Sequence, residues 1–512
     1  MRFLREVPWP RDVGTLARGL ADAAAAGGAV SGGATSTDST AHHGGWFWLD
    51  GETSERAGEA SEQFGERGRS YLGIASEVRW ARRGREREFL RELRGGELGH
   101  GDSLGRVPRD GEPRVSASLP SDATGFASGW VTALSYEFGV SLLGIDPAAD
   151  AAAPAVALRA DAVLVLDHAS GTAEVRGESE AVVAEWIGLL GELDGWERTG
   201  DPDSPDAPER PDAPERSDAL GEPNVSDGFD PPAWRRPDAD YRAEVEACRA
   251  AIRDGDAYVL CLTDTAEKRG DFDPLDLYLR LRASGGSAMR GGLIAAGDRA
   301  LVSASPERFL GVRGRRVETH PIKGTRPRGG SAVEDAYLAA ELAADPKERA
   351  ENLMIVDLMR NDLSRICRTG SVGVEGFLRV EHHPRVHQLV STVAGELLEG
   401  ADVCDAVEAC FPGGSMTGAP KHSAVEILGE IEGAPRGLYS GCFGWIDDGG
   451  DAELAMTIRS IELRGIGTSD AEARVGAGGG ITADSDADRE LAEKNLKAAA
   501  LLAALSPGTP VS

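Results

Sequence analysis

The sequence lacks several features that define common classes of protein. No apolar run approaches the roughly 18 residues that a membrane-spanning helix needs. The N-terminal stretch Met1–Glu6 is charged and soon followed by proline, so we expect no signal peptide. The six cysteines are scattered without a CxxC pair, which is typical of reduced thiols and not of a disulfide framework or zinc site. We therefore expect a cytoplasmic protein.

Positive charge is also scarce. The chain has 55 Lys and Arg against 85 Asp and Glu, giving a net charge of −30. This balance argues against nucleic acid or an anionic membrane as a partner. Part of the acidity lies in one Pro-rich segment that repeats PDAPER at Pro205–Arg210 and Pro211–Arg216, so it says little about an active site. With 512 residues and 41% hydrophobic residues, the chain is long enough for one large or two fused domains.

Three regions differ in composition. Residues 1–198 contain short apolar runs such as Trp46–Asp50 and Ala162–Asp167, which predict a β-rich region; the Ala/Gly/Ser/Thr-rich residues 20–45 predict a loose insertion within it. Residues 199–236 have too little apolar surface to offset chain entropy, so we predict a disordered linker. Residues 237–512 mix helix-like and strand-like patterns densely and should form the catalytic body.

One lysine stands at a suggestive place in this body. Lys323 lies in the stretch HPIKGTRPRG, between a strand-like approach and a turn favoured by Pro327 and Gly329. An amine is a good nucleophile only when its ammonium form is disfavoured, by burial or by nearby cations such as Arg326 and Arg328. The alternative is an ordinary solvated lysine in a basic loop.

Two helices are predicted to carry paired glutamates. Asp345 is placed to cap a helix that has Pro346 at its first position, and Glu348 and Glu351 would share one face of it. A second capped helix near the C-terminus repeats this spacing at Glu490 and Glu493. If the pairs converge, they would repel unless a cation lies between them, and carboxylates with retained waters suit Mg²⁺. Taken separately, each pair also fits an ordinary solvated helix face.

Two glycine-rich stretches offer backbone N–H groups near helix starts. FPGGSMTGAPK at 411–421 and VGAGGGI at 475–481 could bind a carboxylate or phosphate, although neither has the order of a P-loop or a dinucleotide-binding fingerprint. The run MTIRS predicts a strand containing Arg459, and a buried Arg requires an anion. That anion is either a structural carboxylate or a ligand.

These stretches together resemble the chorismate-utilising enzymes, which include anthranilate, aminodeoxychorismate, isochorismate and salicylate synthases. PIKGTRPRG, ERAENLMIVDLMRNDL, LVSTVAGEL, FPGGSMTGAPK, YSGCFGW, TIRS and GGGITADSD occur in family order over about residues 238–505. The resemblance implies an α+β fold like that of anthranilate synthase component I, with two facing β-sheets flanked by helices. Lys323 resembles the aminodeoxychorismate synthase component I group, because anthranilate synthases carry Ala at that place.

The resemblance also implies roles for individual residues. Lys323 would be the covalent nucleophile and Glu307 the general acid in amination of chorismate at C4. Glu351 and Glu493 would bind Mg²⁺, while Glu348 and Glu490 hold its waters. The residues implied to bind chorismate are Gly324, Thr325, Tyr439, Arg459, Gly478, Gly479, Gly480 and Lys497.

Some features depart from the family. Gln388 stands where many relatives have His, and Val259 where many have Gln or Glu, so we assign no catalytic histidine. No glutaminase half is visible, and the resemblance therefore implies a separate glutaminase subunit that supplies ammonia. The Leu-Leu-Glu-Ser-type segment of tryptophan-binding relatives is not evident, so we predict no tryptophan site. The alternatives are an anthranilate or isochorismate synthase, or a non-catalytic scaffold that binds chorismate or a glutaminase.

Overall fold

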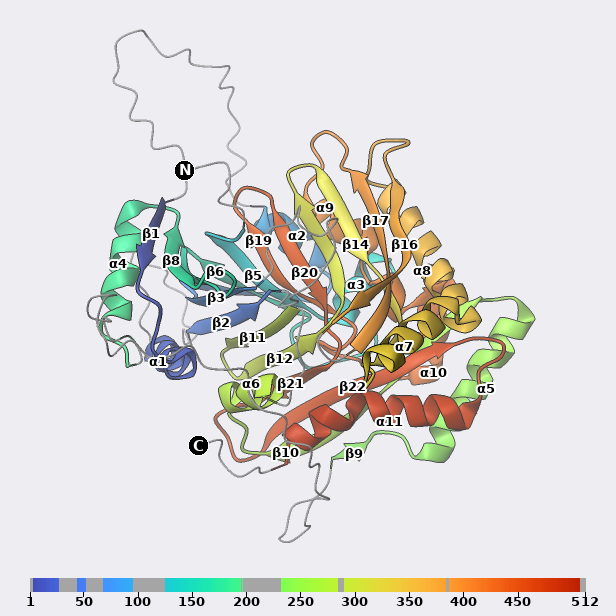
Figure 1. The fold of residues 1–512 in the computed structure, drawn as a ribbon. Coiled ribbons are helices and arrows are strands. Elements are labelled where there is room, and N and C mark those ends of the chain that lie inside the picture. The colour runs from blue at the N-terminus through green and yellow to red at the C-terminus, as the bar shows by residue number, and fades with distance from the viewer. Residues whose placement is uncertain are drawn as a thin grey trace.

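The fold is built on two antiparallel β-sheets with helices around them (Figure 1). The computed structural model describes residues 3–26, 44–51, 68–94, 125–194, 196, 232–283, 290–383 and 386–506. Within these ranges every strand pair is antiparallel. The expected α+β architecture with two facing sheets is therefore confirmed.

Sheet A contains 12 strands in the described part of the chain, in the order β1-β8-β7-β3-β2-β11-β12-β21-β22-β10-β18, with β9 also paired to β10. Their bounds are β1 Phe3–Val7, β2 Gly45–Asp50, β3 Arg69–Ile74, β7 Ala162–Asp167, β8 Thr172–Gly177, β9 Ala233–Trp234, β10 Val259–Gly270, β11 Arg290–Ala296, β12 Arg299–Ser305, β18 Gly418–Ala419, β21 Ser460–Arg464 and β22 Ala471–Ile481.

Sheet B contains 10 strands among the same described residues, in the order β15-β17-β14-β13-β20-β19-β5-β6-β4, with β16 also paired to β17. Their bounds are β4 Glu77–Trp80, β5 Gly129–Leu134, β6 Ala155–Ala160, β13 Arg308–Arg313, β14 Arg316–His320, β15 Ile322–Pro327, β16 Gly373–His382, β17 Val386–Glu396, β19 Cys442–Asp447 and β20 Ala452–Met456.

Helices cover the outer faces of both sheets. They are α1 Val13–Ala25, α2 Glu86–Leu93, α3 Tyr136–Leu142, α4 Glu180–Leu190, α5 Asp238–Asp254, α6 Pro274–Ala283, α7 Ala332–Ala344, α8 Pro346–Ser364, α9 Val403–Cys410, α10 Lys421–Glu432 and α11 Ala487–Ala504, with a 3₁₀ turn, η2, at Gly414–Met416. No helix in the described ranges has both the length and the apolar character needed to cross a bilayer.

Strands from the two halves of the sequence share both sheets. In sheet A, β2 pairs with β11; in sheet B, β5 pairs with β19. Figure 1 shows these blue and cyan strands beside green and orange ones. The space between the sheets is filled by side chains of both halves, including Phe47, Phe126 and Trp445, and the last two rings stack at 5.3 Å. Residues 1–198 and 237–512 therefore form one folded body.

The chain passes between the sheets at several places, and two of these crossings lie next to each other. It leaves sheet A after Ser305 and enters sheet B at Arg308, and it returns between Met456 and Ser460. The two crossings contact each other, because the Met456 amide donates to the carbonyl of Glu307 at 2.9 Å and the Ala304 amide donates to that of Arg459 at 3.0 Å. Two of the predicted site residues thus lie at one junction.

Two local predictions were wrong. Residues 20–25 belong to α1, which Asp12 caps and which buries Leu16 and Leu20; the rest of the predicted insertion up to residue 43 lies outside the described residues. The predicted linker ends earlier than residue 236, because Ala233–Trp234 already forms β9 on β10, while residues 199–231 lie outside the described ranges. The glycine-rich stretch 475–481, for which no element was predicted, is the end of strand β22, and β10 pairs along it.

Candidate active site

Lys323 projects from an irregularity in an edge strand. It lies in β15, whereas the sequence had placed it between a strand-like approach and a turn, and the register between β15 and β17 shifts between Ile322 and Thr325. A bulge of this kind re-aims the side chains it carries. Gly324 has φ +92°, and a Cβ there would approach Leu342 Cδ1 to 2.8 Å, so only glycine fits without strain.

The charges around Lys323 are acidic. Burial lowers the pKa of its ammonium, but Cys261, Glu351, Glu307 and Glu493 together outweigh burial and raise it. The expectation that Arg326 and Arg328 lower this pKa was wrong. Arg326 is paired with Glu341, Asp345 and Glu348, and Arg328 with Asp335, so both guanidinium groups are neutralised on helix α7 and its junction with α8.

Glu307 has the environment of a protonated carboxyl group. It is 5% exposed, and its Oε1 is buried without a hydrogen-bond partner. Burial raises the pKa of Glu307, while the Ser415 hydroxyl and the cations of Lys323, Lys497 and Arg290 act in the opposite direction without cancelling it. A raised pKa lets a carboxyl group hold its proton to higher pH, which suits a proton donor.

The two glutamate pairs are presented by the starts of α8 and α11. The Asp345 side chain accepts from the amides of Lys347 and Glu348, and Pro346 occupies the first turn, which confirms the predicted cap. Asp486 caps α11 by accepting from the Arg489 amide at 3.0 Å. Both pairs of glutamates therefore lie within the first two turns of a capped helix, near the positive end of its dipole.

The two pairs face each other. Burial raises the pKa of both Glu348 and Glu490. The charge of Glu351 raises the pKa of Glu348 further, and the charges of Glu493 and Glu351 raise that of Glu490 further. Burial lowers the pKa of the Lys347 ammonium, but Glu351, Glu490, Glu493 and Glu348 outweigh it and raise that pKa. Its Nζ lies 3.7 Å from Glu351 Oε1. A lysine cation thus compensates four converging carboxylates.

The donor set is compatible with a water-rich Mg²⁺ site. All candidate ligands are carboxylate oxygens, and Mg²⁺ commonly binds only one or two carboxylates and keeps several waters. In the described ranges no three or more acidic, His or Cys side chains are grouped closely enough to enclose a metal ion by themselves. The geometry therefore fits a shared, hydrated cation and not a closed protein cage.

The glycines of β22 line the space beside these acids. A Cβ on Gly479 would lie 3.0 Å from Glu490 Oε2, and one on Gly476 would lie 2.0 Å from the Tyr439 ring. β21 pairs with β22 only as far as Val475. Because alternate N–H groups of an antiparallel strand point to opposite edges, some amides of residues 478–480 point away from β10 toward an edge without a strand partner in the described chain.

Three polar residues close this end of the strand. Lys497 donates from Nζ to the Gly478 carbonyl at 2.9 Å and lies 2.7 Å from Glu493 Oε1. Arg459, with φ +52°, lies in the crossing after β20 and not in a strand as predicted. Its guanidinium donates to the Lys497 carbonyl at 2.7 Å, and among the described residues it forms no direct ion pair with a carboxylate. Tyr439 is 9% exposed and packs on Gly476.

The structure thus brings most predicted site residues to one place. Lys323, Glu307 and the glutamate pairs interact electrostatically, while Gly478–Gly480, Tyr439, Arg459 and Lys497 form a connected group on β22 and α11. Thr325 is exposed, and its strand partner is Gln388. Its position beside Lys323 is its only link to the site.

Sequence reasoning missed two neighbours of the lysine. Cys261 contributes most among the groups that raise the Lys323 pKa, and it is paired with Gly480 across β10 and β22. Lys347 was visible one turn before Glu351, but nothing local indicated that it would meet both glutamate pairs. His387 is fully buried, and its Nε2 lies 2.8 Å from Asp335 Oδ1.

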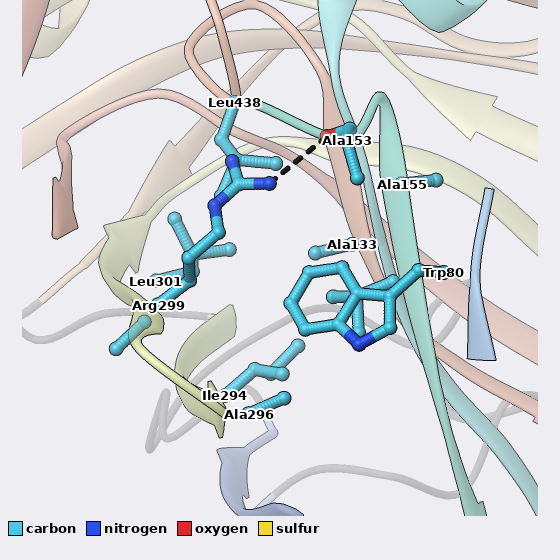
Figure 2. Close-up of a pocket in the computed structure, with 11 residues that line it drawn as sticks. Trp80, Ala133, Ala153, Ala155, Ile294, Ala296, Arg299, Leu301 and Leu438 are labelled. Atoms are coloured by element: carbon cyan, nitrogen blue, oxygen red, sulfur yellow. Dashed lines mark hydrogen bonds between the residues drawn. The ribbon is translucent and has the colours of Figure 1, made fainter. Parts of the chain in front are cut away.

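Small hollows lie next to the site but do not coincide with it. One, shown in Figure 2, lies at the seam of the sheets beside Trp80, Ala133 and Arg299, and its volume of about 10 Å³ suits a single water. A second of about 10 Å³ lies behind Tyr439 and is lined by Thr457, whose Oγ1 has no hydrogen-bond partner. Neither is large enough for an organic substrate.

Several known proteins are similar to this chain in sequence. Residues 80–503 match the family described as chorismate binding enzyme. An aminodeoxychorismate synthase of Streptomyces griseus is 39% identical over 407 residues, which is 77% of this chain and 52% of that protein. An aminodeoxychorismate synthase of Streptomyces pristinaespiralis is 48% identical over 52% of this chain and 36% of its own length. Anthranilate synthase component 1 of Halobacterium salinarum is 45% identical over 52% of this chain and 50% of its own length.

Solved structures share the fold. Anthranilate synthase component I from Streptococcus pneumoniae superposes with a TM-score of 0.62 at 24% identity, covering 92% of this chain and 95% of that one. The menaquinone-specific isochorismate synthase from Escherichia coli gives a TM-score of 0.62 at 16% identity, covering 99% and 95%. The chain thus spans nearly the full length of these structures but only 52% and 36% of the two Streptomyces relatives.

Proposed function

Because the chain belongs to the chorismate-binding enzyme family, we propose that it aminates chorismate at C4, as aminodeoxychorismate synthase component I, with ammonia from a separate glutaminase. The observation that carries the proposal is the placement of the Lys323 amine among Glu307, Glu351 and Glu493, opposite the glycine edge of β22. Related synthases that make anthranilate also match the sequence, and the lysine is what separates this proposal from theirs.

Chorismate would bind with its ring between Lys323 and the β22 edge. Arg459 supports a substrate carboxylate there, because among the described residues this guanidinium forms no direct ion pair, and Glu493 acts on it only as a nearby charge. The open amides of Gly478–Gly480 and the side chains of Tyr439 and Lys497 would hold the other polar groups of the ring. Gly324 and Thr325 would line the opposite wall.

The reaction would proceed in two additions. Lys323 Nζ, once deprotonated, would form a bond to ring carbon C2 while the C4–O bond breaks, and the proton of Glu307 would leave with that oxygen as water. Ammonia would then form the new bond at C4 as the C2–N bond to Lys323 breaks, which restores the lysine and leaves the enolpyruvyl ether intact. The raised pKa of Glu307 supports its part as proton donor.

Mg²⁺ would be held by Glu351 and Glu493, with Glu348 and Glu490 binding its waters. When bound, it would supply positive charge that attracts and polarises the ring carboxylate. The positive charge of the metal would also offset the repulsion among the four glutamates, which raises the pKa of Glu348 and Glu490. The exposed ammonium of Lys347, with 58% of its side chain accessible, would move aside on metal binding.

Product analysis tests the proposal. The purified chain with chorismate, Mg²⁺ and ammonium chloride should form aminodeoxychorismate, identified by mass and by its retained enolpyruvyl group, and EDTA should suppress it. Lys323→Ala should lower the rate by roughly 10² or more, because the covalent route is lost. Formation of o-anthranilate or isochorismate instead would reject the assignment, and unchanged turnover by Lys323→Ala would remove the covalent role.

A further inference from the structure

The segment that carries the proposed proton donor packs against the glycine-rich stretch 411–421. The Met456 amide donates to the Glu307 carbonyl at 2.9 Å, and a Cβ on Gly413 would approach Met456 Sδ to 2.5 Å. The same Cβ would lie 3.6 Å from the ring of Phe309, two residues after the acid. Because Met456 and Phe309 touch both segments, the crossing that contains Glu307 and the 3₁₀ turn η2 lie side by side.

Two buried polar atoms at this contact have no hydrogen-bond partner within the described ranges. One is the hydroxyl oxygen Oγ of Ser415, a residue of η2 that is 4% exposed, and the other is Oε1 of Glu307. A buried polar atom without a partner is costly, so such atoms are uncommon. Burial raises the pKa of Glu307, and the Ser415 hydroxyl is foremost among the groups that oppose this rise. The two atoms are therefore near enough to interact without yet forming a regular hydrogen bond.

Arg436 fixes the turn from behind. Its guanidinium is 3% exposed and donates to the Met416 carbonyl at 2.7 Å and to the Cys261 carbonyl at 2.9 Å. Two further hydrogen bonds, of 2.8 and 2.7 Å, join the guanidinium to the two carboxylate oxygens of Glu432. A bidentate pair of this kind sets both position and orientation. The backbone that carries Ser415 is thus held next to the acid by a buried ion pair.

From this arrangement we infer that Ser415 is a positioning residue for the proton donor: its hydroxyl donates a hydrogen bond to Glu307 Oε1, which leaves the acidic proton on Oε2. The inference rests on the proposed amination, in which Glu307 protonates the departing hydroxyl group. Catalytic hydrogen bonds are often long in the free enzyme and tighten in the reacting complex, which accounts for the two unpaired atoms. Once Glu307 has given up its proton, the same hydroxyl stabilises the carboxylate that remains.

The other groups that act on the acid lie on different elements. Against the effect of burial, the cations of Lys323 on β15, Lys497 on α11 and Arg290 on β11 also lower the pKa of Glu307. A substitution of Ser415 leaves these three charges in the protein. Its effect on the titration of Glu307 therefore reports the contribution of the hydroxyl.

Ser415→Ala tests the inference by infrared titration of the acid itself. The carboxyl C=O band of Glu307 is identified as the band missing from Glu307→Gln, and its intensity is followed across a pH series in EDTA without substrate. A hydroxyl that donates to a carboxylate favours the ionised form, so its removal should raise the pKa of Glu307 and move the midpoint about 0.5–1 pH unit higher. In the amination assay kcat should fall roughly fivefold or more, with KM within about twofold, because the substrate-binding residues are unchanged.

Ser70→Ala is the matched control. Ser70 is 1% exposed, and its hydroxyl donates to Asp50 Oδ1 at 2.5 Å between β3 and β2, which carry no residue of the site. This variant loses the same kind of buried contact, so it should keep the wild-type midpoint and kcat, while thermal unfolding reports any loss of stability common to both variants.

Three results would overturn the inference: a midpoint that Ser415→Ala leaves in place or lowers, equal shifts in Ser415→Ala and Ser70→Ala, or a wild-type kcat in Ser415→Ala. Failure of the wild-type protein to form aminodeoxychorismate would instead reject the proposed function. The infrared midpoint needs no turnover, so it would still decide whether the hydroxyl acts on Glu307.

Discussion

At the scale of single residues, the site is defined by which charges surround one amine. Lys323 lies among acids, so its ammonium is favoured in the absence of a metal. Glu307 lies in a dry position that favours its protonated form. Both shifts favour the protonated form, of the carboxyl group and of the amine alike. A cation between Glu351 and Glu493 would cancel the charges that hold the lysine protonated, so metal binding would activate the amine.

We therefore expect Glu351→Gln to lower the pKa of Lys323, because the substitution removes an anion that stabilises the ammonium form. Competitive acetylation across a pH series in EDTA, read by mass spectrometry, should place the midpoint for Lys323 at lower pH than in wild type. Asp357→Asn is the control, since Asp357 is 78% exposed on the same helix and pairs with Arg360. A midpoint that stays in place or moves to higher pH would contradict the electrostatic account.

At the scale of elements, the irregular strand β15 aims the lysine. The shifted register against β17 lets β15 depart from regular pairing at Lys323 and Gly324, and the glycine permits both a positive φ and close contact with Leu342 and Glu348. The strand, α7 and α8 therefore pack at one point. A substitution there should lower the stability of the fold and change the direction in which the Lys323 side chain points.

Gly324→Ala should destabilise the fold by about 1–3 kcal/mol and reduce amination, since the added methyl meets Leu342 and Glu348 as well as an unfavourable φ. Thermal unfolding and the ammonium-dependent rate are the measurements. Gly370→Ala is a useful comparison, because Gly370 has φ +79° with no atom near its would-be Cβ, so that variant reports backbone strain alone. If Gly324→Ala and Gly370→Ala change the amination rate equally, the packing around Gly324 does not orient the Lys323 side chain.

At the scale of the whole molecule, both sheets depend on strands from distant parts of the chain. β11 lies between β2 and β12, and β19 lies between β5 and β20. Removing residues 1–198 would leave the edges of β11 and β19 unpaired and expose the aromatic interior around Trp445. Unpaired edges and exposed apolar surface favour aggregation.

A fragment of residues 232–512 should therefore lack a cooperative unfolding transition and catalytic activity. Co-expression with a separate fragment of residues 1–198 should restore both, because the strand pairs β2–β11 and β5–β19 can form between two chains. Calorimetry and the amination assay distinguish the outcomes. A cooperative, active 232–512 fragment alone would show that the first half is dispensable for the fold.

The sequence by itself determined the local features of this protein. The cap at Asp345 with Pro346, the strands at Trp46–Asp50 and Ala162–Asp167, and the order of the motifs could all be predicted, because caps and strand patterns depend on residues close in sequence. Where local composition misled, as at 20–25, an apolar helix face outweighed the loop-like preference of Ala and Gly.

Only the tertiary structure decided which of these features meet. Cys261 on β10 interacts with Lys323 on β15 although the two strands lie in different sheets, and Lys347 reaches the acids of α11 because the two helix starts converge. The pairing of Arg326 and Arg328 with carboxylates of α7 and the α7–α8 junction reversed the charge expected around the amine. Electrostatic interactions act through space, over a few ångströms between groups far apart in the chain, so the charge state of the site is a property of packing that the order of residues does not display.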